Sequence, residues 1–113
     1  MGKIAVLICL SVFLCPFFVL AHPPSRIDAE YDDAAKELKL DIIHPVEAPK
    51  SHFIYRVTVD VDGKRLIDKE YDEQTDDMEQ QVFLNVPGVE KGSTIDIEAF
   101  CNRYGEKKGQ IRI

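Results

Sequence analysis

Four residues of this chain carry side chains that bind transition metals. His22, His44 and His52 are its three histidines, and Cys101 is the last of its three cysteines. Imidazole and thiolate together favour iron, copper or zinc over magnesium or calcium. Each of the four lies in a loop or at the expected end of a strand, and such positions can gather at one edge of a β-sandwich. The spacing alone also allows the plainer interpretation, in which Cys101 is a small core residue and the histidines are ordinary loop residues.

The segments that must position these residues alternate apolar and polar residues with the period of two that is typical of β-strands. We expect strands over 27–31, 38–42, 53–61, 66–71, 78–86, 94–101 and 111–113. Tyr55 is expected to share a face with Val57, Asp62-Gly63 is a tight-turn signal, and 102–109 is expected to be a loop. About seven short strands with regular spacing predict an all-β fold, an immunoglobulin-like β-sandwich.

The first 21 residues have the composition of a signal peptide. Lys3 precedes an uncharged apolar run, and Val19-Leu20-Ala21 fits a cleavage site. We therefore expect cleavage before His22, a mature domain over 22–113, and a periplasmic or secreted location. The alternative is an uncleaved N-terminal membrane anchor, although the apolar run is slightly short for a membrane span.

The charge of the chain limits its partners. Its formal net charge of −6 argues against nucleic acid and anionic membrane surfaces. The acidic stretch 72–79 lacks the spacing of a calcium loop, so we expect a solvated loop there. Cleavage would remove Cys9 and Cys15 and leave Cys101 without a disulfide partner in the domain. A domain of this size often needs another support, so metal binding and homo-oligomer formation are both candidates.

Three motifs resemble, in the same order, the iron-binding domain of superoxide reductases and desulfoferrodoxins. The first motif, His22-Pro23-Pro24, is similar to the His-x-Pro that precedes the first strand in that family. The second motif, His44-Pro45 followed by His52-Phe53-Ile54, is similar to the His-Pro and His-x-Ile pair of the family. The third motif, Cys101-Asn102-Arg103-Tyr104-Gly105, is similar to its Cys-Asn-x-His-Gly. The resemblance covers the mature chain at low identity. The sandwich that it implies agrees with the strands expected from the alternation.

The resemblance implies non-haem iron and the reduction of superoxide to hydrogen peroxide, with an unknown electron donor. Family members hold ferrous iron with four histidines and one axial cysteine. Cys101 would be the axial thiolate here, and His22, His44 and His52 would be imidazole ligands. Tyr104 stands where the family has its last histidine, and a phenolate can bind ferric iron in that position. Lys50, between His44 and His52, would supply a cation that attracts the anionic substrate.

Two further interpretations use the same residues. The α-amino group and the ring of a mature N-terminal His22 could chelate the metal together and replace the missing ligand. The same donors also suit copper, in a copper-binding or electron-transfer module. A metal-free immunoglobulin-like binding domain is the remaining alternative.

Overall fold

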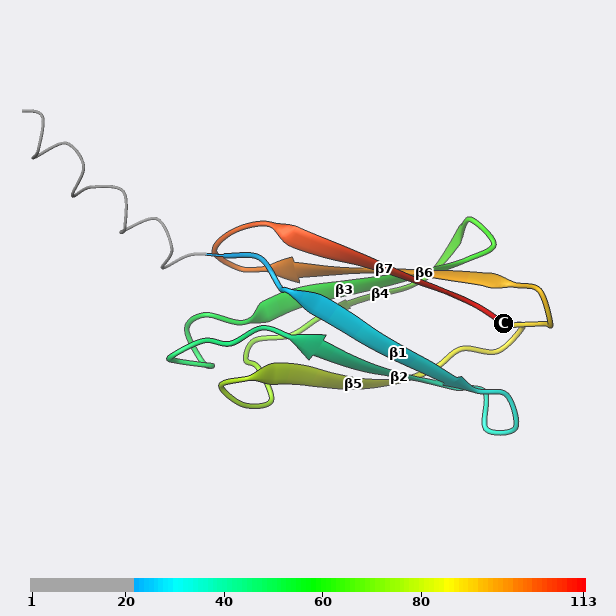
Figure 1. The fold of residues 1–113 in the computed structure, drawn as a ribbon, viewed down its shortest axis with the longest axis horizontal. Helices are drawn as coiled ribbons and strands as arrows, with labels where there is room; N and C mark the ends of the chain where they lie inside the picture. Colours follow the sequence, from blue (N-terminus) through cyan, green and yellow to red (C-terminus); the bar gives the residue numbers. More distant parts are fainter. Residues whose placement is uncertain (1–21) are drawn as a thin grey trace, which may run out of the picture.

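The computed structural model describes residues 22–113, and the expected signal peptide over 1–21 lies outside them. In the described part, the strands are β1 (Arg26–Asp32), β2 (Glu37–Ile43), β3 (Ile54–Val61), β4 (Lys64–Glu70), β5 (Glu79–Asn85), β6 (Thr94–Cys101) and β7 (Glu106–Arg112). They form a three-stranded sheet of order β1-β2-β5 and a four-stranded sheet of order β4-β3-β6-β7, which lie face to face (Figure 1). The predicted all-β, immunoglobulin-like β-sandwich is confirmed.

The core lies between the two sheets and follows the alternation of the sequence. In β2 and β6, which are flanked by strands on both sides, every second residue is buried. Leu38, Leu40 and Ile42 of β2 face Ile95 and other branched residues of the opposite sheet in one apolar cluster. Burial of such a side chain contributes about 1.5–3 kcal/mol, so these two strands supply much of the stability.

A β-bulge in β3 changes the face that one predicted core residue occupies. Ile54 pairs with Cys101 and Arg56 pairs with Phe100, so Tyr55 is an extra residue in the ladder. Ile54 is fully buried, whereas Tyr55 is 36% exposed. The expectation that Tyr55 shares a buried face with Val57 is wrong because an inserted residue interrupts strict alternation. The bulge lies at the end of β3 next to Cys101.

The last strand is longer than predicted. β7 begins at Glu106, whereas the sequence indicated a loop up to Gly109. This strand pairs with β6 alone, and its charged side chains point into solvent, as is common for a sheet edge. A Cβ atom on Gly109 would lie 3.2 Å from Cβ of Ile27, so the glycine lets β7 approach β1 closely.

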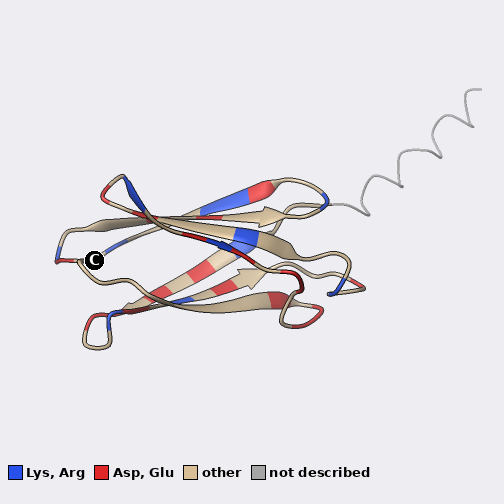
Figure 2. Ribbon diagram, turned by 180° about the vertical axis from the view of Figure 1, so that it is seen from behind, with Lys and Arg blue, Asp and Glu red and all other residues tan. Residues whose placement is uncertain are grey.

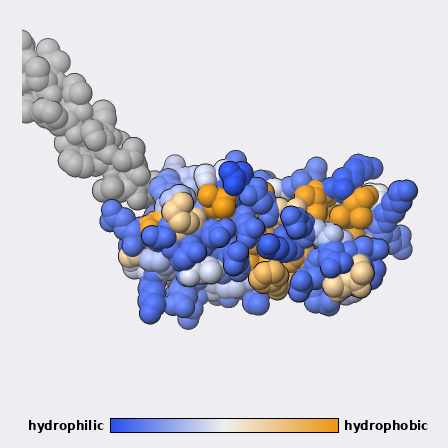
Figure 3. All heavy atoms as spheres, turned by 60° about the horizontal axis from the view of Figure 1, so that its bottom comes forward, coloured by the Kyte–Doolittle hydropathy of each residue, from blue (hydrophilic) through white to orange (hydrophobic). Residues whose placement is uncertain are grey.

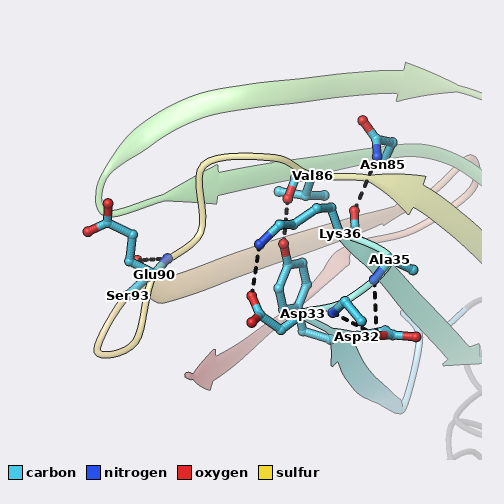
Figure 4. A network of polar contacts seen from close by, with 10 residues as sticks. Asp32, Asp33, Ala35, Lys36, Asn85, Val86, Glu90 and Ser93 are labelled. Atoms are coloured by element: carbon cyan, nitrogen blue, oxygen red, sulfur yellow. Dashed lines mark hydrogen bonds and ion pairs between the residues drawn. The ribbon is translucent and has the colours of Figure 1, made fainter.

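Polar contacts hold one end of the sandwich (Figure 4). Lys36 ends the β1–β2 turn in a left-handed conformation with φ 55°, and its carbonyl accepts a hydrogen bond from Val86 N–H at 2.8 Å. The hydroxyl of Tyr31 donates to the carbonyl of Val86 at 2.7 Å. These contacts link β1, the turn and the segment after β5 at this end of the fold.

The surface is mainly hydrophilic. Lys, Arg, Asp and Glu residues are scattered over the strands and loops of both sheets (Figure 2). Apolar residues are dispersed among hydrophilic ones on the face that Figure 3 shows. No helix in residues 22–113 is long and apolar enough to cross a membrane.

Candidate metal centre

Four of the five predicted ligands come together at the end of the sandwich opposite the β1–β2 turn, and these are His22, His44, His52 and Cys101. His44 directly follows β2, His52 lies shortly before β3, and Cys101 is the last residue of β6. The chain enters β1 at the same end (Figure 1), and the ring of His22 lies near those of His44 and His52. Because β2 belongs to one sheet and β6 to the other, the site lies at the open edge between the two layers.

One ligand atom from each of His44, His52 and Cys101 lies within 4.8 Å of the others. The three side chains are buried, with exposed fractions of 0%, 7% and 6%. Bonds of about 2.0–2.3 Å place two ligands of one metal ion roughly 3–4 Å apart. A small inward movement would therefore let the three atoms share one ion.

The ring of His22 completes a cluster of three imidazoles. Its centroid lies 5.2 Å from that of His44 and 5.7 Å from that of His52, and the latter two centroids are 4.8 Å apart. Nδ1 of His22 lies 3.1 Å from the carbonyl oxygen of Pro23. The chelate with the α-amino group would need this ring nitrogen, so it requires the ring to turn, and it stays a prediction.

His52 has a buried nitrogen with no hydrogen-bond partner. Its Nε2 atom is inaccessible and unpaired among the described residues. Burial is the main cause that lowers the pKa of His52, and the neighbouring His44 and Arg103 add to it. The ring is therefore held neutral, which is the form that binds a metal. An unpaired buried nitrogen costs about 1–3 kcal/mol, and a bound metal ion would remove this cost.

The sulfur of Cys101 accepts two main-chain hydrogen bonds. The N–H groups of Arg103 and Tyr104 lie 3.3 and 3.5 Å from Sγ. N–H donors aimed at a sulfur stabilise negative charge on it and tune the metal that it binds. The tight turn after β6 thus directs two main-chain N–H groups at the sulfur of Cys101.

Asn102 fixes the position of His52 through the residues on either side of it. Its Oδ1 accepts from Phe53 N–H at 2.9 Å, and its Nδ2 donates to the carbonyl of Ser51 at 3.1 Å. The residue after Cys101 therefore holds the segment that carries His52. Two of the three ligands of the group are joined in this way.

Gly105 brings the turn after β6 against the segment that carries His22. Its φ is +75°, and an added Cβ atom would lie 2.9 Å from Cβ of Pro23. A larger residue would have to displace Pro23, which directly follows His22. The glycine is thus required both by the turn and by this contact.

A cavity of about 570 Å³ opens beside the histidines. His22 and His52 line it together with Glu47, Asp77 and Arg103. Arg103 is the cation of this cavity, whereas Lys50 is exposed and is not among the lining residues. In the sequence, Arg103 lies within the Cys101–Gly105 motif, and this position was the signal that could have indicated a cation at the cavity.

Tyr104 lies on another side of the centre. Its side chain is 60% exposed and lines a groove of about 430 Å³ with Tyr55, Tyr71 and Cys101. It is not among the residues that line the cavity beside His22 and His52. The structure thus gathers His22, His44, His52 and Cys101, and it leaves Lys50 and the ring of Tyr104 outside that cluster. The proposed roles of these two residues stay predictions.

The fold and these side chains define a small β-sandwich with a buried His/His/Cys group that could hold a metal ion. Comparison of the chain with protein families, curated proteins and solved structures finds no match. Any assignment of function must therefore be supported by the residues of the site.

Proposed function

We propose that this protein is an exported non-haem iron protein of the superoxide reductase type. The observation that carries the proposal is the convergence of His44, His52 and Cys101, which are 57 residues apart at most in the sequence. These are the residues of the motifs that resemble that family, and the ring of His22 lies against them. A buried, unpaired His52 nitrogen and a sulfur with two N–H donors fit an iron ion.

Iron held there would supply the electron that, with two protons, converts superoxide to hydrogen peroxide. The histidines would hold it together with Cys101, whose thiolate would donate electron density to it. Arg103 would attract the small anion into the cavity of about 570 Å³, where Glu47 and Asp77 oppose this attraction. We therefore expect the charge of the cavity to have only a modest effect on the capture of the anion.

A copper centre is the second candidate, because one further observation favours it. Met78 lines the same cavity as His52 and is 54% exposed, and a thioether that moved in to join two imidazoles and a thiolate would complete the ligand set of a copper electron-transfer site. A protein of this kind would retain copper and would not consume superoxide.

The metal content of the anaerobically purified protein tests both candidates. Cys101→Ala removes the thiolate, and Ile97→Val on the same strand is the control for a small loss of core volume, which costs about 0.5–1.5 kcal/mol. We expect close to one iron per chain in the wild type and in Ile97→Val, and none in Cys101→Ala. Superoxide consumption by the iron-loaded protein would then be measured by stopped flow.

The other outcomes are equally informative. Copper retained without superoxide consumption favours the electron-transfer module. No metal in the wild type, even after reconstitution with ferrous iron, copper and zinc, refutes both metal functions and leaves a metal-free binding domain.

A further inference from the structure

Gln74 is a buried residue next to the candidate metal centre that no motif of the sequence indicated. It lies in the acidic loop between β4 and β5 and is 4% exposed. Its main-chain N–H donates to the carbonyl of Pro49 at 3.0 Å, in the loop between His44 and His52. Its side chain reaches His44 directly. One residue therefore contacts both the loop between the two histidines and a ligand itself.

The contacts of the Gln74 amide fix which end is oxygen. Nε2 lies 2.7 Å from the carbonyl oxygen of His44 and 3.1 Å from that of Asp76. Both neighbours can only accept hydrogen bonds, so the NH₂ group must face them. The other end is then the carbonyl oxygen, Oε1, which lies 2.8 Å from Nδ1 of His44.

This orientation determines the proton on His44. Because Oε1 of Gln74 can only accept, Nδ1 of His44 must carry the hydrogen and donate it. Nε2 of His44 lies 3.3 Å from the carbonyl oxygen of His22. Because that oxygen can only accept, the lone pair of Nε2 in a neutral ring protonated on Nδ1 faces it without a hydrogen bond, and Nε2 can bind a metal only if the His22 carbonyl moves aside. The shorter contact, at 2.8 Å to Gln74, favours Nδ1 as the protonated nitrogen.

We propose that Gln74 is the positioning residue of the metal centre, which holds His44 with its hydrogen on Nδ1 and presents Nε2 to the metal. This inference rests on the proposed function. A histidine that binds a metal commonly donates its other N–H to an outer partner, which fixes the tautomer and the ring plane. Gln74 also holds the main chain of His44, so a single amide orients both the ring and the backbone of this ligand.

The matched control is Gln80, a second buried glutamine of the same region. It is 5% exposed, and its Oε1 accepts from Thr75 N–H at 2.8 Å. It thus supports the same loop, and among the described residues its side chain has no hydrogen bond to a histidine. Gln74→Leu and Gln80→Leu remove similar side chains, and only the first removes the partner of His44.

The proton on His44 can be measured by ¹⁵N NMR of the ring nitrogens in the metal-free, full-length protein. We expect a protonated Nδ1 in the wild type and in Gln80→Leu, and a loss of this preference in Gln74→Leu. Gln74→Glu retains an acceptor for Nδ1 and should retain the protonated Nδ1. In metal titrations, Gln74→Leu should bind ferrous iron about 10–100-fold more weakly, while Gln80→Leu stays near the wild type.

Two results would overturn the inference. One is an NMR spectrum of the wild type in which His44 is neutral with its hydrogen on Nε2. This measurement needs no variant, so it decides the question even if Gln74→Leu does not fold. The other is an equal loss of metal affinity in both leucine variants, which would mean that Gln74 acts only through the loop. If the wild type binds no metal, the proposed function is refuted, and so is the part of this inference in which Nε2 of His44 binds a metal. The NMR spectrum still decides which nitrogen of His44 is protonated.

Discussion

Replacing Asn102 by alanine tests whether hydrogen bonds between loops set the geometry of the metal centre. The substitution removes the bonds to Phe53 N–H and to the carbonyl of Ser51, on either side of His52. Each bond contributes about 0.5–1.5 kcal/mol, so the free energy of unfolding should fall by about 1–3 kcal/mol. We expect the lower half of this range, because these exposed groups can bond to water instead.

The effect of Asn102→Ala on metal binding should exceed its effect on folding. A released His52 segment must be ordered again each time the metal binds, and loss of such outer contacts typically weakens binding 10–100-fold. This equals about 1.4–2.7 kcal/mol. The assays are urea unfolding of the metal-free protein and competition with a chelator of known affinity for the metal.

Asn85→Ala is the control for Asn102→Ala. The amide of Asn85 donates to the carbonyl of Lys36 at 3.3 Å, at the opposite end of the sandwich. The free energy of unfolding of this variant should fall, and its metal affinity should equal that of the wild type. The reasoning is refuted if Asn102→Ala binds metal as tightly as the wild type, or if both alanine variants lose affinity equally.

Three further predictions concern the close approach, the acid response and the opposite end of the fold. Gly105→Ala should lower the free energy of unfolding by about 1–2 kcal/mol because the backbone there is left-handed. It should also weaken metal binding, because the new Cβ atom displaces Pro23. Gly88→Ala is the control: its φ is +82° and the space around it is open, so it should show the backbone cost alone. Folding lowers the pKa of His52. Below the ordinary histidine pKa near 6.5, the unfolded chain therefore binds more protons than the folded chain does. The contribution of His52 to the stability of the metal-free protein should be present above that pH and should be lost as the pH falls below about 6.5; urea titrations that show no such fall in the wild type, or the same fall in His52→Gln, would contradict this. Tyr31→Phe should lower the free energy of unfolding by about 1 kcal/mol through loss of the bond to Val86, with unchanged metal affinity, and an altered affinity would show that the two ends are coupled.

The alternation of the sequence predicted most of the fold because most strands have one buried face. β2 and β6 show this directly, since every second residue is buried. Alternation could not predict Tyr55, because a bulge depends on the pairing of two strands. It also missed the first half of β7, since Lys107 and Lys108 lie on an edge where burial imposes no pattern.

The candidate ligands were predictable from residue type, and their supports were not. Histidine and cysteine are few in the chain and carry distinctive chemistry. Gln74 is one polar residue in an acidic loop, and its importance depends on a contact with His44, 30 residues away. The role of Lys50 was predicted from its position in the loop and stays a prediction. Arg103, which the sequence reasoning did not single out, lines the cavity.

The position of the candidate centre between the layers has a consequence for the lifetime of the folded chain. His44 follows β2 of one sheet and Cys101 ends β6 of the other, and antibody domains join the equivalent strands by a disulfide. A metal ion bound to both residues would be a reversible cross-link in the same place, in a domain whose described cysteine is free. Separation of the sheets would then require release of the ion, so unfolding and proteolysis would slow as the metal becomes available. Metal supply would thereby regulate how long the protein persists as well as what it does.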